Sequence, residues 1–384
     1  MRCVFISNYF NHHQSDFCNA LYEELGDNFI FIATSKISDE RVALGYQNEG
    51  FPNYVVEFNG ANKKRLLKII KNSDVVILGH GNDDLIRTRL IRDKLTFRYQ
   101  ERPYRKGFPN RKRVRLNIKH FFKHRIHRNL FMLCASGYTA SDYLATHTFF
   151  NKCFRFGYFP VFEPLQDAKL FIENKFKNKK IIFLWVGRFI ELKRPDFIIR
   201  LALDLIKNKI TNFEIDIIGS GPLETEIKKV VANNNLDKYI IFHGPLPYSE
   251  VRKYMKNSHI FLFTSNKEEG WGAVLNEAMN SACAVISNIE IGSTPYLVKN
   301  KVNGVAFNND YDSFLNSVLE VVNNPALLKA LSYNAYQTVS SLWNGKIAAE
   351  RFLNLCKCIL EKRDYKRLYE EGPCSLDNYK NFTI

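Results

Sequence analysis

The chain has 384 residues, of which 46% are hydrophobic and 24% are charged. This composition excludes a mainly disordered chain, and 19 Gly without a period exclude a collagen. The length corresponds to about two or three domains. No apolar run reaches the ~18 residues that a membrane-spanning helix needs, and the apolar stretch 1–10 is too short for a signal peptide. Because the eight cysteines show no paired CxxC spacing, we expect a reduced, cytoplasmic protein.

The net charge of +16 is concentrated in residues 87–128, which we call the basic belt. This segment contains sixteen Lys or Arg and two acids, a net charge of +14 in 42 residues. Aromatic residues are interleaved with the cations. Such a segment can bind nucleic-acid phosphates, an anionic membrane or an acidic acceptor, or it can form a merely solvated face.

Short apolar runs alternate with helical patterns in two blocks along the chain. The strands predicted for the first block are 3–6, 29–33, 74–78, 95–99 and 130–135. Those predicted for the second block are 181–186, 213–218, 239–242, 259–263 and 284–286. These runs are apolar nearly throughout, as strands buried on both faces of a parallel sheet are. The alternation therefore predicts two doubly wound α/β domains, followed by a long helical pattern over about 326–367.

Prolines at 160 and 164 interrupt both patterns and indicate the boundary between the domains. We expect an N-terminal domain over 1–162, a C-terminal domain over 163–342 and a helical tail over 343–384. In doubly wound sheets, ligands bind outside the carboxyl ends of the strands. The residues that follow predicted strands include His12, His13, His80, Glu101, Gly187, Arg188, Gly219 and His243.

The densest chemical signal lies in residues 269–279. Glu269 precedes a Gly after a strand, and Glu277 lies about one turn into a helical pattern that begins near Ala273. The N-terminus of a helix binds anions through its free N–H groups and its dipole. Glu277 could accept hydrogen bonds from two hydroxyls of a ribose, and Glu269 could bind the hydroxyls of a second polyol. Phosphate between two hydroxyl-rich groups describes a nucleotide sugar.

These residues resemble the donor half of the retaining glycosyltransferases of family 4, which have the GT-B fold. The matching motifs are Val186-Gly187-Arg188 followed by Lys193, Ile218 to Pro222, Phe242-His243-Gly244, Glu269-x7-Glu277, Gly292-Ser293 and Asn303-Gly304. The resemblance implies two Rossmann-like domains with a cleft between them. It also implies that the C-terminal helix crosses back to the first domain.

The resemblance assigns roles to individual residues. Arg188 and Lys193 would hold the donor diphosphate, Glu277 the ribose and Glu269 the transferred sugar. Other predicted donor contacts are Gly187, Gly219, Leu246 beside the base, and the backbone N–H groups of Gly270, Trp271, Gly272, Ala273 and Val274. An Arg fork, a Lys and a helix N-terminus can stabilise a departing diphosphate without a metal, so we expect neither a metal nor a cofactor. Asp310-Tyr311-Asp312 is a DxD, the pattern of a metal site, but it precedes a helical pattern and favours capping.

The acceptor side departs from the family pattern. Many members carry a His after the strand at 95–99, whereas this chain has Gln100-Glu101-Arg102. Glu101 is our candidate for the polar group near the anomeric carbon, the alternative being an ion pair with Arg102. His80, between two glycines, is a second candidate catalytic residue, and a structural role for it is about as plausible.

The sequence thus predicts a metal-independent, retaining hexosyltransferase-type enzyme. It would move a sugar from a nucleotide sugar, most often a UDP-sugar in this family, to a lipid-linked or polysaccharide acceptor of a bacterial capsule or lipopolysaccharide O-antigen. The basic belt would dock the protein on the anionic inner face of the cytoplasmic membrane, and we expect no nucleic-acid partner. The alternatives are an epimerase or phosphorylase of the same fold and a basic nucleic-acid-binding protein. The sugar, base, acceptor and oligomeric state stay open.

Overall fold

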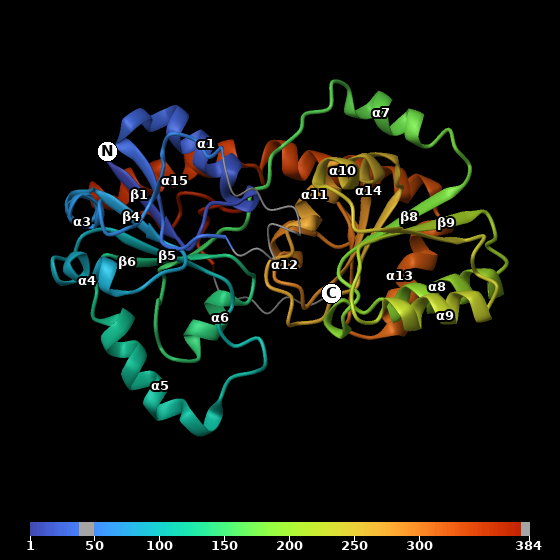
Figure 1. The fold of residues 1–384 in the computed structure, drawn as a ribbon, viewed down its shortest axis with the longest axis horizontal. Coiled ribbons are helices and arrows are strands. Elements are labelled where there is room, and N and C mark those ends of the chain that lie inside the picture. Colours follow the sequence, from blue (N-terminus) through green and yellow to red (C-terminus); the bar gives the residue numbers. More distant parts are fainter. Residues whose placement is uncertain (38–49, 378–384) are drawn as a thin grey trace. The chain divides into compact units, whose positions relative to one another are not determined.

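The structure is a computed structural model that describes residues 1–37 and 50–377. It divides into two compact units (Figure 1). Among the described residues, unit 1 comprises Met1–Val161 and the chain from Leu342 to Asp377, and unit 2 comprises Phe162–Ser341. None of the described helices is both long and apolar enough to cross a membrane.

Unit 1 is built on a seven-stranded parallel sheet with the order β3-β2-β1-β4-β5-β6-β7. Its strands are β1 Cys3–Ser7, β2 Phe29–Ala33, β3 Val55–Glu57, β4 Val75–Leu78, β5 Thr96–Gln100, β6 Leu130–Cys134 and β7 Cys153–Arg155. Its helices are α1 His12–Leu25, α3 Lys63–Asn72, α4 Asp84–Ile91, α5 Arg113–His120, a π-helical turn Phe121–Arg125, α6 Thr139–Leu144 and α15 Gly345–Leu360. The five strands predicted for this unit are confirmed, and β3 and β7 were not predicted.

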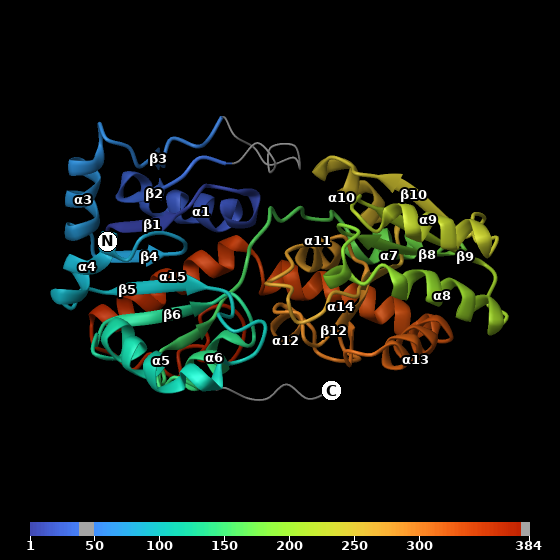
Figure 2. The same cartoon turned by 60° about the horizontal axis from the view of Figure 1, so that its bottom comes forward.

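Unit 2 has a six-stranded parallel sheet with the order β10-β9-β8-β11-β12-β13 (Figure 2). Its strands are β8 Ile181–Val186, β9 Phe213–Ile218, β10 Ile240–Gly244, β11 Ile260–Phe263, β12 Ala284–Asn288 and β13 Val305–Phe307. Its helices are α7 Ala168–Lys175, α8 Asp196–Lys207, α9 Glu224–Asn233, α10 Tyr248–Asn257, α11 Val274–Asn280, α12 Thr294–Leu297, α13 Tyr311–Val322 and α14 Pro325–Ser341. The apolar side chains of α8 and α13 pack with β8 and β9 in one buried core.

The prediction of one long helical pattern over 326–367 is wrong. The chain forms two helices, because α14 ends at Ser341 and α15 begins at Gly345. Asn344 caps α15 by accepting a hydrogen bond from the Ile347 N–H at 3.0 Å. The Gly345 N–H donates to the Asp16 carboxylate of α1 at 2.8 Å, and a side chain at Gly345 would collide with that backbone. Helix α15 packs on α1 and therefore belongs to unit 1.

Candidate functional site

The strand order of unit 2 reverses between β8 and β11, and the carboxyl ends of these two strands flank the place where doubly wound sheets bind ligands. Gly187 and Arg188 follow β8, and the loop that carries Glu269 follows β11. Helix α11, which carries Glu277, comes next. The fold therefore brings the sequence-predicted donor residues to one end of one sheet.

The strand ends beside this site approach one another closely. The Gly187 N–H donates to the Ile218 carbonyl at 3.0 Å, and the Gly219 N–H donates to that of Gly244 at 2.9 Å. Gly219 has a φ of +134°, and a Cβ there would collide with the Gly187 carbonyl oxygen. This packing explains why glycine stands at 219. Contact of Gly187 or Gly219 with a donor stays a prediction.

Lys193 and Glu269 form an ion pair in unit 2. The Lys193 Nζ lies 2.5 Å from the Glu269 Oε2, and the two side chains are 16% and 15% exposed. The backbone of Lys193 is anchored, because its carbonyl accepts a hydrogen bond from the Thr264 hydroxyl at 2.7 Å, and that hydroxyl accepts one from the Trp185 indole N–H at 3.0 Å. The residues predicted for the diphosphate and for the sugar are thus partners in this structure.

The loop between β11 and α11 has a conformation that requires glycine. Gly272 has a φ of +76°, and a Cβ there would collide with the Phe263 ring. The Trp271 side chain is fully buried, and its indole N–H donates to Asn276 at 2.8 Å. The Trp271 side chain therefore supports the loop, and only its backbone could contact a donor. The N–H groups of Gly270, Gly272, Ala273 and Val274 donate to no acceptor in the described part of the chain.

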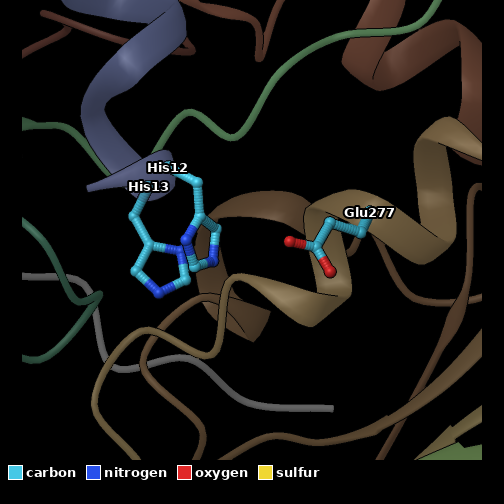
Figure 3. A group of neighbouring side chains, drawn as sticks. All are labelled: His12, His13 and Glu277. Carbon is cyan, nitrogen blue, oxygen red and sulfur yellow. The ribbon is translucent and has the colours of Figure 1, made fainter. Parts of the chain in front are cut away.

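Glu277 is a buried carboxyl group on α11, and its side chain is drawn in Figure 3. Burial raises its pKa to about 7, although the nearby Arg252 guanidinium opposes the shift. Arg252 donates to the Glu277 carbonyl at 2.6 Å and to the Asn280 side chain at 2.6 Å, so it is occupied mainly by the end of α11. A carboxyl group with a raised pKa on the helix beside a ligand site is a functional candidate.

Arg188 and Leu246 differ from the buried members of the site. The Arg188 side chain is exposed, and no carboxylate of the described residues pairs with it. Leu246 is half-buried in the loop after β10.

Beside that loop, the His243 imidazole contacts Asp216 at 2.7 Å and the Tyr254 hydroxyl at 3.1 Å, and burial raises the pKa of Asp216 although His243 opposes this. This cluster was not singled out from the sequence, because Asp216 lies 27 residues before His243.

In unit 1 the strand order reverses between β1 and β4, and histidines follow both strands. Figure 3 shows His12 and His13 in the first turn of α1. The His13 ring stacks on Tyr158 with centroids 5.4 Å apart, and burial lowers the pKa of His12. His80 follows β4 and is exposed. The catalytic role predicted for His80 stays a prediction.

Glu101 follows β5 and is held by side chains of unit 1. It pairs with Arg105 and accepts a hydrogen bond from the Tyr158 hydroxyl at 2.8 Å. The alternative of an ion pair with Arg102 is wrong, because Arg102 binds Asp142 at 3.1 Å.

The basic belt is not one uniform charged surface. Arg89 is fully buried and donates to three backbone carbonyls near the end of α3 and the start of β5, at 2.6–2.8 Å. Arg98 is also buried and pairs with Asp83 at 2.7 Å. These two cations stabilise the fold of unit 1. The exposed cations of the belt lie chiefly along residues 105–128.

Helix α5 and the π-helical turn present an apolar face to solvent, and Figure 1 shows α5 at the outer margin of unit 1, below its sheet. Val114, Ile118 and Phe122 are 73%, 58% and 64% exposed. His120 and His124 of the same segment are buried instead. Burial, with help from nearby lysines, lowers the pKa of His120 to about 4, so this ring is neutral at pH 7. The exposed face of this segment therefore carries apolar side chains among its cations, whereas two histidines are buried beneath it.

Asp310 caps α13. Its carboxylate accepts a hydrogen bond from the Ser313 N–H at 2.8 Å, which confirms the capping role predicted for the DxD pattern.

A comparison with known families identifies the second unit. Residues 166–338 match the family described as glycosyl transferases group 1, which is nearly all of unit 2. Over these residues, unit 2 is similar to the glycosyl transferases group 1 family. The sequence-based resemblance is confirmed at this level of family and fold.

Individual relatives agree with this assignment. The chain is 30% identical over 218 residues to an uncharacterized glycosyltransferase of Methanocaldococcus jannaschii, a match that covers 54% of this chain and 55% of that one. It is 30% identical over 132 residues to the amylovoran biosynthesis glycosyltransferase AmsK of Erwinia amylovora, which covers 33% of this chain and 32% of that one. The chain spans about half the length of the first curated relatives it matches.

A solved structure extends the likeness to the whole chain. HepE of Anabaena, solved in complex with UDP, superposes with a TM-score of 0.67 at 10% identity, over 93% of this chain and 100% of that one. At this identity the likeness shows the fold alone. The GT-B fold with two Rossmann-like domains is confirmed.

Proposed function

We propose that the chain is a glycosyltransferase whose unit 2 binds a nucleotide sugar. One observation carries the proposal. Lys193, Glu269 and Glu277 lie on the elements that follow β8 and β11, at the switch point of a sheet in a glycosyl transferases group 1 unit. A cation for phosphate and two carboxylates for hydroxyls are the groups that recognise the two ends of a nucleotide sugar.

In the reaction, the bond between the sugar and the diphosphate breaks, and negative charge develops on the departing nucleoside diphosphate. In this proposal Arg188 and Lys193 would bind that charge, Glu277 would accept hydrogen bonds from the ribose hydroxyls, and Glu269 would accept them from hydroxyls of the transferred sugar. Because two cations serve the diphosphate, we expect activity without a divalent metal. Full loss of activity in a chelator, restored by Mn²⁺, would contradict this expectation.

We further propose that the sugar is transferred with retention of configuration, as the family resemblance implies. The acceptor hydroxyl would attack the face that the diphosphate leaves, and a diphosphate oxygen would take the hydroxyl proton. The acceptor would bind unit 1 and be a lipid-linked or growing surface glycan. Support for this class comes from the relative named for amylovoran biosynthesis.

The proposed location is the anionic inner face of the cytoplasmic membrane. Support comes from α5 and the π-helical turn, where exposed Ile118 and Phe122 respectively lie among the cations of the basic belt. An apolar groove of about 270 Å³, lined by these two residues and by Arg125 and His147 among others, lies on the same segment. An apolar face bordered by cations binds the boundary between headgroups and acyl chains of an anionic bilayer. Equal binding to neutral and anionic vesicles at low salt would contradict the electrostatic part of this proposal.

A thermal-shift panel of UDP-, GDP-, ADP-, CMP- and dTDP-sugars tests the proposed function. A ligand at ~100 times its dissociation constant stabilises a protein by about 2.7 kcal/mol, so one base should raise the Tm. Turnover of that donor should then need an added acceptor, because consumption without one would indicate an epimerase. A flat panel together with salt-sensitive binding to DNA would contradict the proposal and favour a nucleic-acid-binding protein.

A further inference from the structure

The Lys193–Glu269 ion pair joins two residues that the proposed function assigns to different parts of the donor. Lys193 would bind the diphosphate, and Glu269 the sugar. In this structure each has the other as partner, with 2.5 Å between Nζ and Oε2. Both side chains are about six-sevenths buried, so neither charge could lose its partner without cost.

The surroundings confine both side chains to this small region. The Lys193 Nζ lies 5.7 Å from the centroid of the Phe263 ring. The Lys193 side chain also passes close to Gly187, since its Cδ would lie 3.6 Å from a Cβ added to that glycine. The Glu269 Cγ lies 3.5 Å from the place that a Cβ on Gly272 would take. The backbone of Lys193 is fixed through Thr264. Because the Lys193 backbone is anchored, we expect a change of partner to take place by rotation of the two side chains.

We propose that donor binding exchanges the partners of this pair. The diphosphate forms an ion pair with Lys193, and the Glu269 carboxylate, once separated from Lys193, accepts hydrogen bonds from the hydroxyls of the transferred sugar. This inference rests on the proposed function, because it needs both ends of the donor in unit 2. It adds a coupling between phosphate recognition and sugar recognition, so that each is favourable only when the other takes place.

The exchange discriminates a donor from the product. A nucleotide sugar separates the pair and supplies a new partner to each member, since sugar hydroxyls donate to a carboxylate. A nucleoside diphosphate without a sugar binds Lys193 and so breaks the ion pair of the partly buried Glu269 carboxylate, but it supplies no sugar hydroxyls in return. Product binding is thereby weakened relative to donor binding. Arg188 lies outside the exchange, because no described carboxylate pairs with it.

The test is a set of titration calorimetry measurements with UDP and a UDP-sugar, or with the corresponding pair for whichever base binds the wild type. Glu269→Gln removes the competing charge, and we expect it to bind UDP about tenfold more tightly while losing the preference for the UDP-sugar. Glu268→Gln is the matched control, because it neutralises the adjacent acid, which makes no ion pair with Lys193 in the described residues. We expect that control to bind both ligands like the wild type.

A double-mutant cycle separates the exchange from a general effect of charge. In a Lys193→Gln background there is no pair to break, so Glu269→Gln should change UDP affinity by less than about twofold. Unchanged or weaker UDP binding by Glu269→Gln in the wild-type background overturns the exchange while the proposed function stands. Failure of the wild type to bind any nucleoside diphosphate or nucleotide sugar overturns both.

Discussion

The switch points of the two sheets can be compared directly, because each is flanked by two strands at the carboxyl end of a parallel sheet. In unit 2, Lys193 and Glu269 pair with each other, and buried Glu277 has a raised pKa. In unit 1, Glu101 is held by Arg105 and Tyr158, two residues of the same unit. The same architecture thus carries an ion pair in each unit, and we propose an exchange of partners only for the pair in unit 2. We therefore expect the donor to bind unit 2.

The largest expected effect comes from Glu277→Ala. The change removes two charge-assisted hydrogen bonds to the ribose, each of which contributes ~1.5–3 kcal/mol, so nucleotide affinity should fall by about 100-fold or more. Titration calorimetry measures the loss. Glu101→Ala in unit 1 is the matched variant and should leave nucleotide affinity within about threefold. Equal losses in both variants would break the distinction between the units.

Arg188→Ala should weaken donor binding by about tenfold to 150-fold, because it removes one charge-assisted contact with the diphosphate. Arg188 is exposed, so the Tm of the ligand-free protein should stay nearly unchanged. Arg87→Ala, an exposed cation of the basic belt in unit 1, is the control and should leave donor affinity unchanged. A drop in the ligand-free Tm with no change in donor binding would assign Arg188 to the fold.

The apolar face of α5 gives a prediction that concerns unit 1 alone. The double change Ile118→Ser and Phe122→Ser should lower binding to anionic vesicles by about tenfold to 100-fold, since two side chains lose apolar burial in the bilayer. Vesicle sedimentation measures this binding. Ile91→Ser on α4 is the matched control, because Ile91 is 74% exposed but lies outside the α5 face. Unaltered vesicle binding by the double variant would mean that the protein is attracted to the bilayer by charge alone.

The pH dependence of donor binding follows from Glu277. Its pKa of about 7 in the ligand-free protein means that the carboxyl group becomes protonated as the pH falls below 7. The protonated group is a poorer acceptor for ribose hydroxyls, so affinity should fall by up to about tenfold per pH unit below 7. Glu277→Gln, whose amide does not titrate, should show a flat profile. A wild-type affinity that is constant from pH 8 to pH 5.5 would contradict this assignment.

Much of the fold could be predicted, because long apolar runs bounded by Gly or Ser mark the central strands. Strands β3, β7 and β13 are each three residues long, too short to show a pattern. The break between α14 and α15 was also missed. Asn344 caps α15 locally, but the contact of Gly345 with Asp16 of α1 joins residues 329 apart and could not be read from the sequence.

Some features of the candidate site could likewise be predicted from the sequence, and others could not. The spacing of Glu269 and Glu277 indicated carboxylates for two polyols, but Lys193 lies 76 residues from Glu269, so their ion pair could not be read from the sequence. The charge of the basic belt was evident, whereas burial of His120 beneath an exposed apolar face was not. Composition shows which side chains are present, and only packing shows which face they take.

The most direct test of the central claim is a crystal structure of the chain with the nucleoside diphosphate that the thermal-shift panel identifies. We predict that both ribose hydroxyls lie within hydrogen-bonding distance of the Glu277 carboxylate and that the diphosphate contacts Arg188 and Lys193. A nucleotide bound away from these residues, or bound to unit 1 alone, would contradict the assignment of unit 2 as the donor-binding half.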